Sequence, residues 1–323
     1  MYRSLFLATA AALLLLASVG GAYAEWAPSK PVRLMVPYAA GGGADLIARR
    51  LAEKVKPALG QPVLVENRPG AGTAIAAAAV ARAPADGHTI LLATSTTLCV
   101  NPILMKGIQY KQEDFAPISV LQSLPFMVVT RPELQVKSLR EFVALAKANP
   151  GKFNYGTLGV GSSNHVLGSV LGSSAGLDIV SVHYTSGAPA LLALKQGEIH
   201  VYFDGISTSI PRVRSGELKG LAVTSRERVK AMPEIPTVAE EGVPDVAVSI
   251  WYGLVAPAGT PPQAIQRLNA EFNKAIAEPD ITASLIADGT EPLLISPAQF
   301  AALIKDDTVL WRKMIEPLNI ELK

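Results

Sequence analysis

The sequence is poor in cysteine and in net charge. Cys99 is the only cysteine among 323 residues, so an intrachain disulfide and a cysteine-based metal centre are both excluded. The 29 Lys and Arg residues nearly balance the 27 Asp and Glu residues, and a formal net charge of +2 is too small to indicate binding to nucleic acid or to a membrane surface. A fold without disulfides depends on its hydrophobic core, and this chain is long enough to build one or two domains.

Long apolar runs are also scarce, since only residues 5–19 form one. Arg3 precedes this run, and Ala22-Tyr23-Ala24 follows it with the small-x-small pattern of a signal-peptide cleavage site. The run is shorter than the ~20 residues that a membrane span needs, and no cysteine follows it that could carry a lipid anchor. The sequence therefore predicts a signal peptide over residues 1–24, cleaved after Ala24, and a soluble protein exported to the periplasm.

The matches to catalytic and nucleotide-binding motifs lack the neighbouring structure or residues that these motifs need. Gly172-Ser-Ser-Ala-Gly176 matches the G-x-S-x-G pattern of serine hydrolases, but that pattern needs a strand before the serine, and residues 164–171 are predicted to be helical. The glycine pairs at 41–43 and 70–72 lack the third small residue of a dinucleotide site, and no G-K-[ST] follows either of them. We therefore expect no enzyme and no cofactor, with an exported serine hydrolase as the alternative.

The histidines do not form a metal-binding pattern either. His88, His165, His183 and His200 are far apart in sequence, and none lies beside an acidic cluster. His165 and His183 fall near predicted loops, where each could donate to a ligand or serve as a structural histidine.

Glycine is concentrated at one point where a strand should meet a helix. The strand at 32–36 leads through Tyr38, Ala39 and Ala40 into Gly41-Gly42-Gly43 and then into an amphipathic helix, whose apolar residues Ile47, Leu51, Val55 and Leu59 are three to four positions apart. Glycine lets a ligand approach the backbone closely, and the free N–H groups of a helix's first turn attract an anion. The loop therefore predicts either a carboxylate site or a tight turn that binds nothing.

The order of strand, loop and helix recurs along the chain, as in right-handed βαβ units on a parallel sheet. The predicted strands cover residues 32–36, 63–67, 89–93, 153–157, 180–184, 199–203 and 221–224. Predicted helices cover residues 73–82, 164–173, 188–196 and 264–277, and two more begin with the capping boxes Ser138–Glu141 and Ser296–Gln299.

Two extended segments break this order, at residues 118–130, with an interruption at Pro125, and at residues 246–256. We interpret them as the only two connections between two α/β lobes. Residues 25–122 and 252–323 would form lobe 1, and residues 123–251 would form lobe 2. The cleft between the lobes would lie at the carboxyl ends of both sheets, where α/β proteins usually bind ligands.

Several polar residues near the predicted cleft have two interpretations. Ser162, Ser163 and Asn164 stand at a helix start, where they would cap free N–H groups and could also contact a ligand. Asp204 ends an apolar strand, so its carboxylate would either order loops and bridge waters or complete a plain turn. For Asp45, helix capping is the stronger interpretation, and ligand contact is the alternative.

As an ordered set, several segments resemble the Bug-type extracytoplasmic solute receptors, the TctC family of the tripartite tricarboxylate transporters. They include Val36-Pro-Tyr-Ala-Ala-Gly-Gly-Gly-Ala-Asp45 with Arg49, Val65-Glu-Asn-Arg-Pro-Gly-Ala-Gly72, Asp86-Gly-His-Thr-Ile-Leu-Leu92, Asn154-Tyr-Gly-Thr157 with Gly161-Ser162 and His165, Tyr202-Phe-Asp204, Leu221-Ala-Val-Thr-Ser225 and Trp251-Tyr-Gly-Leu-Val-Ala-Pro-Ala-Gly-Thr260. The resemblance covers essentially the whole chain after residue 24. One departure is His183-Tyr-Thr-Ser-Gly187, where the family commonly has Pro-Tyr-Lys-Gly.

The resemblance implies a two-lobed periplasmic binding protein of the type II-like, Venus-flytrap class, each lobe a mostly parallel sheet flanked by helices. Such a receptor closes over a small mono-, di- or tricarboxylate and delivers it to the membrane permease subunits of a tripartite tricarboxylate transporter; we expect a monomer. In the family, the first glycine loop and the loop at Gly161-Ser162 hold a carboxylate through backbone N–H groups. The candidate ligand-binding residues are Tyr38, Ala40, Gly42, Gly43, Ala44, Asp45, Ser95, Thr157, Gly161, Ser162, Ser163, His183, Thr185 and Asp204.

Overall fold

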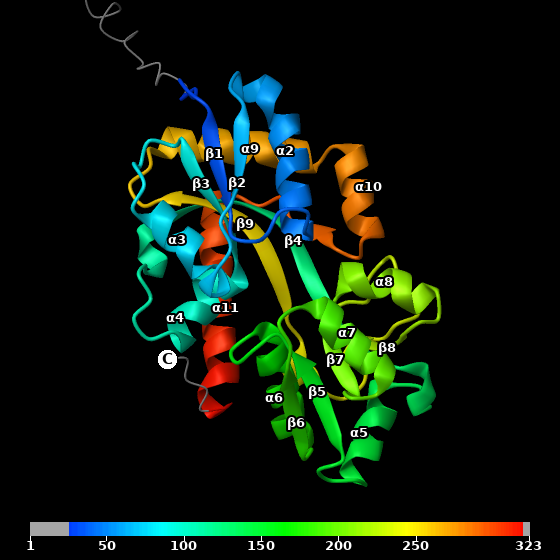
Figure 1. Cartoon of the computed structure of the whole chain (residues 1–323). Helices are drawn as coiled ribbons and strands as arrows, with labels where there is room; N and C mark the ends of the chain where they lie inside the picture. Colours follow the sequence, from blue (N-terminus) through cyan, green and yellow to red (C-terminus); the bar gives the residue numbers. More distant parts are fainter. Residues whose placement is uncertain (1–25, 319–323) are drawn as a thin grey trace, which may run out of the picture.

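A computed structural model describes residues 26–318. The predicted signal peptide, residues 1–24, lies outside the described residues. Figure 1 shows two α/β lobes, one above the other, with strands β4 (Phe115–Thr130) and β9 (Ser249–Pro257) running between them. None of the described helices is both long enough and apolar enough to cross a membrane.

Lobe 1 contains a sheet in the order β2-β1-β3-β9-β4. The strands β1 (Val32–Val36), β2 (Val63–Asn67) and β3 (Thr89–Thr94) are mutually parallel, whereas β9 and β4 run antiparallel to their neighbours. A two-residue strand, β10 (Glu291–Pro292), also pairs with β4. The predicted strands at 32–36 and 63–67 are confirmed residue by residue, because each is rich in apolar residues and is followed by a glycine-containing turn.

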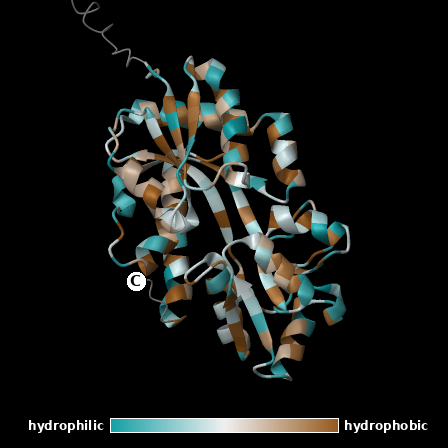
Figure 2. Cartoon of the chain, in the orientation of Figure 1, coloured by the Kyte–Doolittle hydropathy of each residue, from teal (hydrophilic) through white to brown (hydrophobic). Residues whose placement is uncertain are grey.

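Helices cover both faces of the lobe 1 sheet. On one face, the buried residues of α2 (Gly43–Leu59), α9 (Pro262–Ile276) and α10 (Pro279–Ala287) form one apolar cluster with β1 and β3. On the other face lie α3 (Ala74–Ala81), the π-helix η2 (Thr96–Val100), α4 (Asn101–Leu104) and α11 (Pro297–Ile315). In Figure 2 the strands are mostly brown between these layers, while the outer sides of the helices carry teal residues.

Lobe 2 repeats this architecture on the continuation of the same sheet, which passes from one lobe to the other through β4. Strands β5 (Phe153–Thr157), β6 (Ile179–His183) and β7 (Val201–Gly205) are parallel, and β7 and β8 (Lys219–Val223) both pair antiparallel with β4. Helices α5 (Leu139–Lys147) and α6 (Ser163–Ala175) cover one face, and α7 (Gly187–Gln196) and α8 (Ile206–Arg214) cover the other.

The predicted interruption at Pro125 is wrong, because β4 is one strand of 16 residues that includes Pro125. Pro125 lies opposite Ser249, the first residue of β9, and the next residue, Phe126, already pairs with Gly205 of β7. A proline lacks the N–H group that a ladder needs, and it is tolerated where a strand changes partners. The second extended segment begins later than predicted, since Pro244–Val246 form a 3-10 turn before β9.

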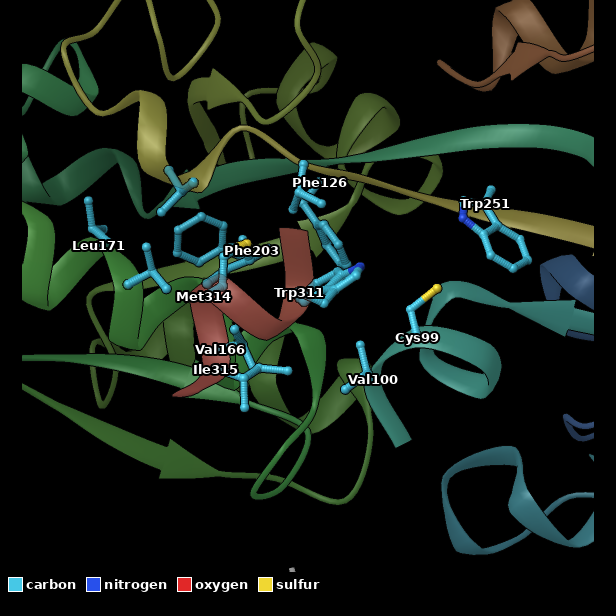
Figure 3. Packing of buried hydrophobic residues seen from close by; sticks show 14 of the residues in the cluster. Cys99, Val100, Phe126, Val166, Leu171, Phe203, Trp251, Trp311, Met314 and Ile315 are labelled. Carbon is cyan, nitrogen blue, oxygen red and sulfur yellow. The ribbon is translucent and has the colours of Figure 1, made fainter. Parts of the chain in front are cut away.

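Besides the two extended strands that run between the lobes, a packing contact of the C-terminal helix also joins them. Trp311, Met314 and Ile315, at the end of α11, belong to the same buried cluster as Val166 and Leu171 of α6. Figure 3 shows Met314 beside Phe203 of β7 and Ile315 beside Val166. The C-terminal helix therefore starts on lobe 1 and ends against lobe 2.

Capping agrees with the sequence at one helix and differs at another. The reciprocal box Ser296–Gln299 at the start of α11 is confirmed. At α5, the Ser138 hydroxyl accepts the N–H of Glu141 as predicted, but the Glu141 carboxylate accepts the N–H of Lys137 at 2.7 Å, one residue before the cap. The predicted capping box of α5 is therefore wrong in its second half.

Candidate functional site

The loop between β1 and α2 presents the start of a 17-residue helix to solvent. Gly42 is the N-cap, no side chain caps the helix, and Gly41, Gly42 and Gly43 are all exposed. Gly41 has φ +83°, which favours glycine, whereas Gly42 has φ −79° and would place a Cβ atom 3.6 Å from the Ala39 carbonyl oxygen. The first turn of α2 thus offers backbone N–H groups and a positive dipole end to an anion.

Asp45 is buried under this loop, and both of its carboxylate oxygens accept hydrogen bonds. Its Oδ2 accepts the N–H of Gly41 at 2.9 Å and Nε of Arg49 at 3.0 Å, and its Oδ1 accepts Nδ2 of Asn67 at 2.9 Å. The hydrogen bonds from Arg49 and then from Gly41 lower the pKa of Asp45 to about 2. These contacts favour a role in ordering the loop, since Asp45 lies inside the helix and its carboxylate reaches back to a residue before the cap.

Tyr38 and the other residues around the loop are fixed by the same network. Asn67 Nδ2 also donates to the Tyr38 carbonyl oxygen at 3.0 Å, and the Tyr38 hydroxyl is hydrogen-bonded to Thr94 at the end of β3. The rings of Tyr38 and Tyr252 are 6.3 Å apart between centroids. Of the neighbouring candidates, Ala40 is exposed and Ala44 is buried.

Ser95 is not on the surface of the cleft, because it is fully buried below the strand β9. Its Oγ accepts the backbone N–H of Trp251 at 3.1 Å and is hydrogen-bonded to the carboxyl group of Asp307 in α11. Asp307 also accepts Nε1 of Trp251 at 2.7 Å, and burial raises the pKa of this carboxyl group to about 6. These contacts tie β9 to the helices of lobe 1.

In lobe 2, the loops after β5 and β6 bring four candidate residues together. Thr157 Oγ1 and His183 Nδ1 are 2.6 Å apart, and the N–H of Gly161 donates to His165 Nδ1 at 3.2 Å. The rings of His165 and His183 are 5.5 Å apart between centroids, and burial lowers the pKa of His165. Ser162 caps α6 by accepting the N–H of His165, as its position predicts.

The remaining candidates lie around this group. Ser163 is buried in the first turn of α6, and Thr185 is exposed in the loop after β6. Asp204 is buried in β7, where its Oδ2 accepts the hydroxyl groups of Thr208 at 2.6 Å and Ser209 at 2.8 Å. Burial raises the pKa of Asp204, and its contacts fix the first turn of α8.

A pocket of about 470 Å³ lies between α2, α8 and α10, three helices that Figure 1 shows where the two lobes meet. Gly43 is the only candidate residue among those that line it. Most residues of the pocket wall were not predicted as site residues. They come from the strands β4 and β9 and from the unpredicted helices α8 and α10, and they include Leu124, Phe126, Ile250, Tyr252, Ile206 and Leu285. Among these wall residues, only Tyr252 lies in a segment, residues 251–260, that the family resemblance had singled out.

Residues 26–318 contain no arrangement typical of a metal site or of a reactive thiol. No group of three or more His, Cys, Asp or Glu residues in this part of the chain is arranged to hold a metal ion. Cys99 is buried, and burial raises the pKa of its thiol to about 12, so it is unreactive at neutral pH.

Comparisons with known proteins agree with this architecture. The model of the tripartite tricarboxylate transporter family receptor (TctC) matches residues 47–320. The protein BugT of Bordetella pertussis is 34% identical over 302 residues, which are 93% of each chain. A structure described as a periplasmic transporter is 35% identical, with a TM-score of 0.82 over 92% of this chain and 99% of that one. Rpa4515 of R. palustris, solved with adipate, is 30% identical, with a TM-score of 0.82 over 91% of this chain and 99% of that one.

Proposed function

This chain belongs to the tripartite tricarboxylate transporter receptor family, whose members are periplasmic solute-binding receptors and not enzymes, and from that premise we propose that it captures a small carboxylate between its lobes. The solute would pass to the membrane permease subunits of a tripartite transporter. Export would depend on the signal peptide at residues 1–24. The receptor would act as a monomer that binds neither nucleic acid nor membrane lipid.

The observation that supports a carboxylate is the start of α2. Two exposed glycines precede a long helix that no side chain caps, a third exposed glycine begins it, and the buried carboxylate of Asp45 accepts the N–H of Gly41. A carboxylate fits such a site because its oxygens accept backbone N–H groups and its charge is attracted by the helix dipole. The adipate bound by Rpa4515 supports the same solute class.

The candidate residues define two halves of the proposed site. Gly42, Gly43 and Ala44 would hold the carboxylate from lobe 1, and Gly161, Ser162 and His183 would approach it from lobe 2 as the lobes close. Residues 25–122 and 252–323 would move as lobe 1 and residues 123–251 as lobe 2, with the hinge near Pro125, where β4 changes partners.

Gly42→Val tests this site. Gly42 has an ordinary φ, and a Cβ atom there would make only an ordinary contact, 3.6 Å to the Ala39 carbonyl oxygen, so the variant should fold, while its side chain blocks the approach of a carboxylate. Native mass spectrometry identifies the carboxylate that co-purifies with the wild type, and calorimetry with that solute should show at least a tenfold loss of affinity in Gly42→Val. Gly172→Ala, in α6 and away from the loop, is the matched control. Unchanged affinity in a folded Gly42→Val protein would remove this loop from the site.

A further inference from the structure

The pocket at the meeting of the lobes is predominantly apolar. Leu46 and Ile47 of α2 form its wall in lobe 1, and Phe126 and Ile206 form its wall in lobe 2. Leu46 is 55% exposed although it stands in the first turn of α2, next to the uncapped N–H groups. An exposed leucine on the wall of a pocket is a surface that a bound apolar group can cover.

Only one of the two helix starts at this pocket is open to an anion. Gly43 of α2 and Gly205, the N-cap of α8, both line the pocket, and neither helix has a side-chain cap. At α8, however, the adjacent carboxyl group of Asp204 already binds the hydroxyl groups of Thr208 and Ser209. A second anion beside Asp204 would meet a carboxyl group and hydroxyl groups that are already engaged.

The one cation among the residues that line the pocket, Arg50, is already bonded to α10 through two uncharged acceptors, Ser284 Oγ and the Asp280 carbonyl oxygen. The guanidinium group of Arg50 donates to Ser284 Oγ at 2.8 Å and is thereby held against α10. Asp288, the other charged residue among those that line the pocket, is exposed and would repel an anion. The Thr290 hydroxyl group is occupied within the protein, since it lies 3.0 Å from the Leu285 carbonyl oxygen and 3.3 Å from Gln122 Oε1.

We propose that this receptor selects monocarboxylates with an apolar body over dicarboxylates. The carboxylate would lie at the first turn of α2, and the hydrocarbon chain would cover Leu46 and extend toward Phe126 and Ile250. This inference rests on the proposed function and specifies the solute class of the same site. Each methylene that leaves water should raise the affinity about three- to fourfold.

Hexanoate and adipate form a matched pair for the test, since both have six carbons and only adipate has a second carboxylate. Calorimetry on the purified protein should show that hexanoate binds at least tenfold more tightly than adipate. Affinity should rise from butyrate to hexanoate by the factor stated for each methylene. Adipate that binds as tightly as hexanoate, or hexanoate that does not bind, would overturn the inference.

Leu46→Ser tests the apolar wall directly. Leu192 of α7 is equally exposed, at 55%, and does not line the pocket, so Leu192→Ser is the matched control. Leu46→Ser should weaken hexanoate about tenfold and leave acetate unchanged, while Leu192→Ser should change neither. Equal effects of the two variants would contradict the proposed contact.

The two proposals fail in different ways. If adipate binds more tightly than hexanoate, loses affinity in Arg50→Gln and still depends on Gly42, Arg50 is the anchor of a second carboxylate; the inference is then wrong and the carboxylate site stands. If binding of both acids survives Gly42→Val, the carboxylate site itself is misplaced.

Discussion

The backbone N–H of Gly41 donates to the carboxylate of Asp45 at 2.9 Å, four residues further along the chain. This contact folds the glycine loop back onto α2 and combines with the bonds from Arg49 and Asn67 to saturate the carboxylate. The N–H that Asp45 occupies lies before the helix cap, so the first turn of α2 stays open for a ligand. A carboxylate of the protein thus orders the loop that is proposed to hold a carboxylate of the solute.

Asp45→Asn should weaken solute binding about tenfold, because an amide cannot accept from Gly41, Arg49 and Asn67 together. The buried donors left without a partner should also lower the free energy of unfolding by about 1–3 kcal/mol. Chemical denaturation and calorimetry at pH 7 measure the two effects. Glu53→Gln, at an exposed position of the same helix, is the control, and an Asp45→Asn protein with wild-type affinity would contradict the ordering role.

The pKa of Asp45 also predicts an acid limit. Because this pKa is lowered to about 2 in the folded protein, the ionised carboxylate stabilises the fold above its ordinary pKa of roughly 4. That stabilisation is lost as the pH falls from about 4 to 2. Unfolding curves between pH 2 and 6 should show this loss in the wild type and a smaller one in Asp45→Asn; identical pH profiles would contradict the assignment.

Asp307 should produce a pH dependence of the opposite sign. Burial raises the pKa of its carboxyl group to about 6, so the folded protein takes up this proton more readily than the unfolded chain. The fold is therefore favoured below about pH 4 and loses stability as the pH rises through 6, by about 3 kcal/mol at most. Asp307→Asn should flatten the free energy of unfolding between pH 4 and 7. A slope equal to that of the wild type would show that Asp307 does not titrate in this range.

Asp204 should affect binding through α8. Asp204→Ala leaves the buried Ser209 hydroxyl group without its acceptor and leaves Thr208 only the Gly205 carbonyl oxygen, so the first turn of α8 should lose its position beside the pocket. We expect a loss of about 1–3 kcal/mol in stability and weaker solute binding, while Asp204→Asn, which keeps an acceptor oxygen, should restore most of both. Equal affinity in Asp204→Ala and the wild type would show that the α8 turn plays no part in the site.

The sequence predicts the elements that a glycine or proline delimits and an apolar pattern fills. The strand β1, the helix α2 and the left-handed C-cap at Gly197 all follow from such local signals. The helix α8 was missed because Ser207, Thr208, Ser209 and Pro211 have low helix propensity, and packing against β4 and β7 decides its conformation. The pocket was missed for the same reason, since its wall depends on α8, on α10 and on the continuation of β4 through Pro125.

Closure of the lobes is the last expectation, and α11 changes how it should occur. A bend confined to β4 and β9 would break few contacts, but Met314 and Ile315 also hold α11 against α6. Because a solute touches both lobes only when they close, binding should shift the population to the closed form. Small-angle scattering should show a smaller radius of gyration at saturation with the solute identified by mass spectrometry. Met314→Ala should loosen the contact between α11 and α6 and alter the radius of the solute-free protein, with Val309→Ala, at an exposed position of the same helix, as control. An unchanged radius at saturation would contradict closure and leave the carboxylate site intact.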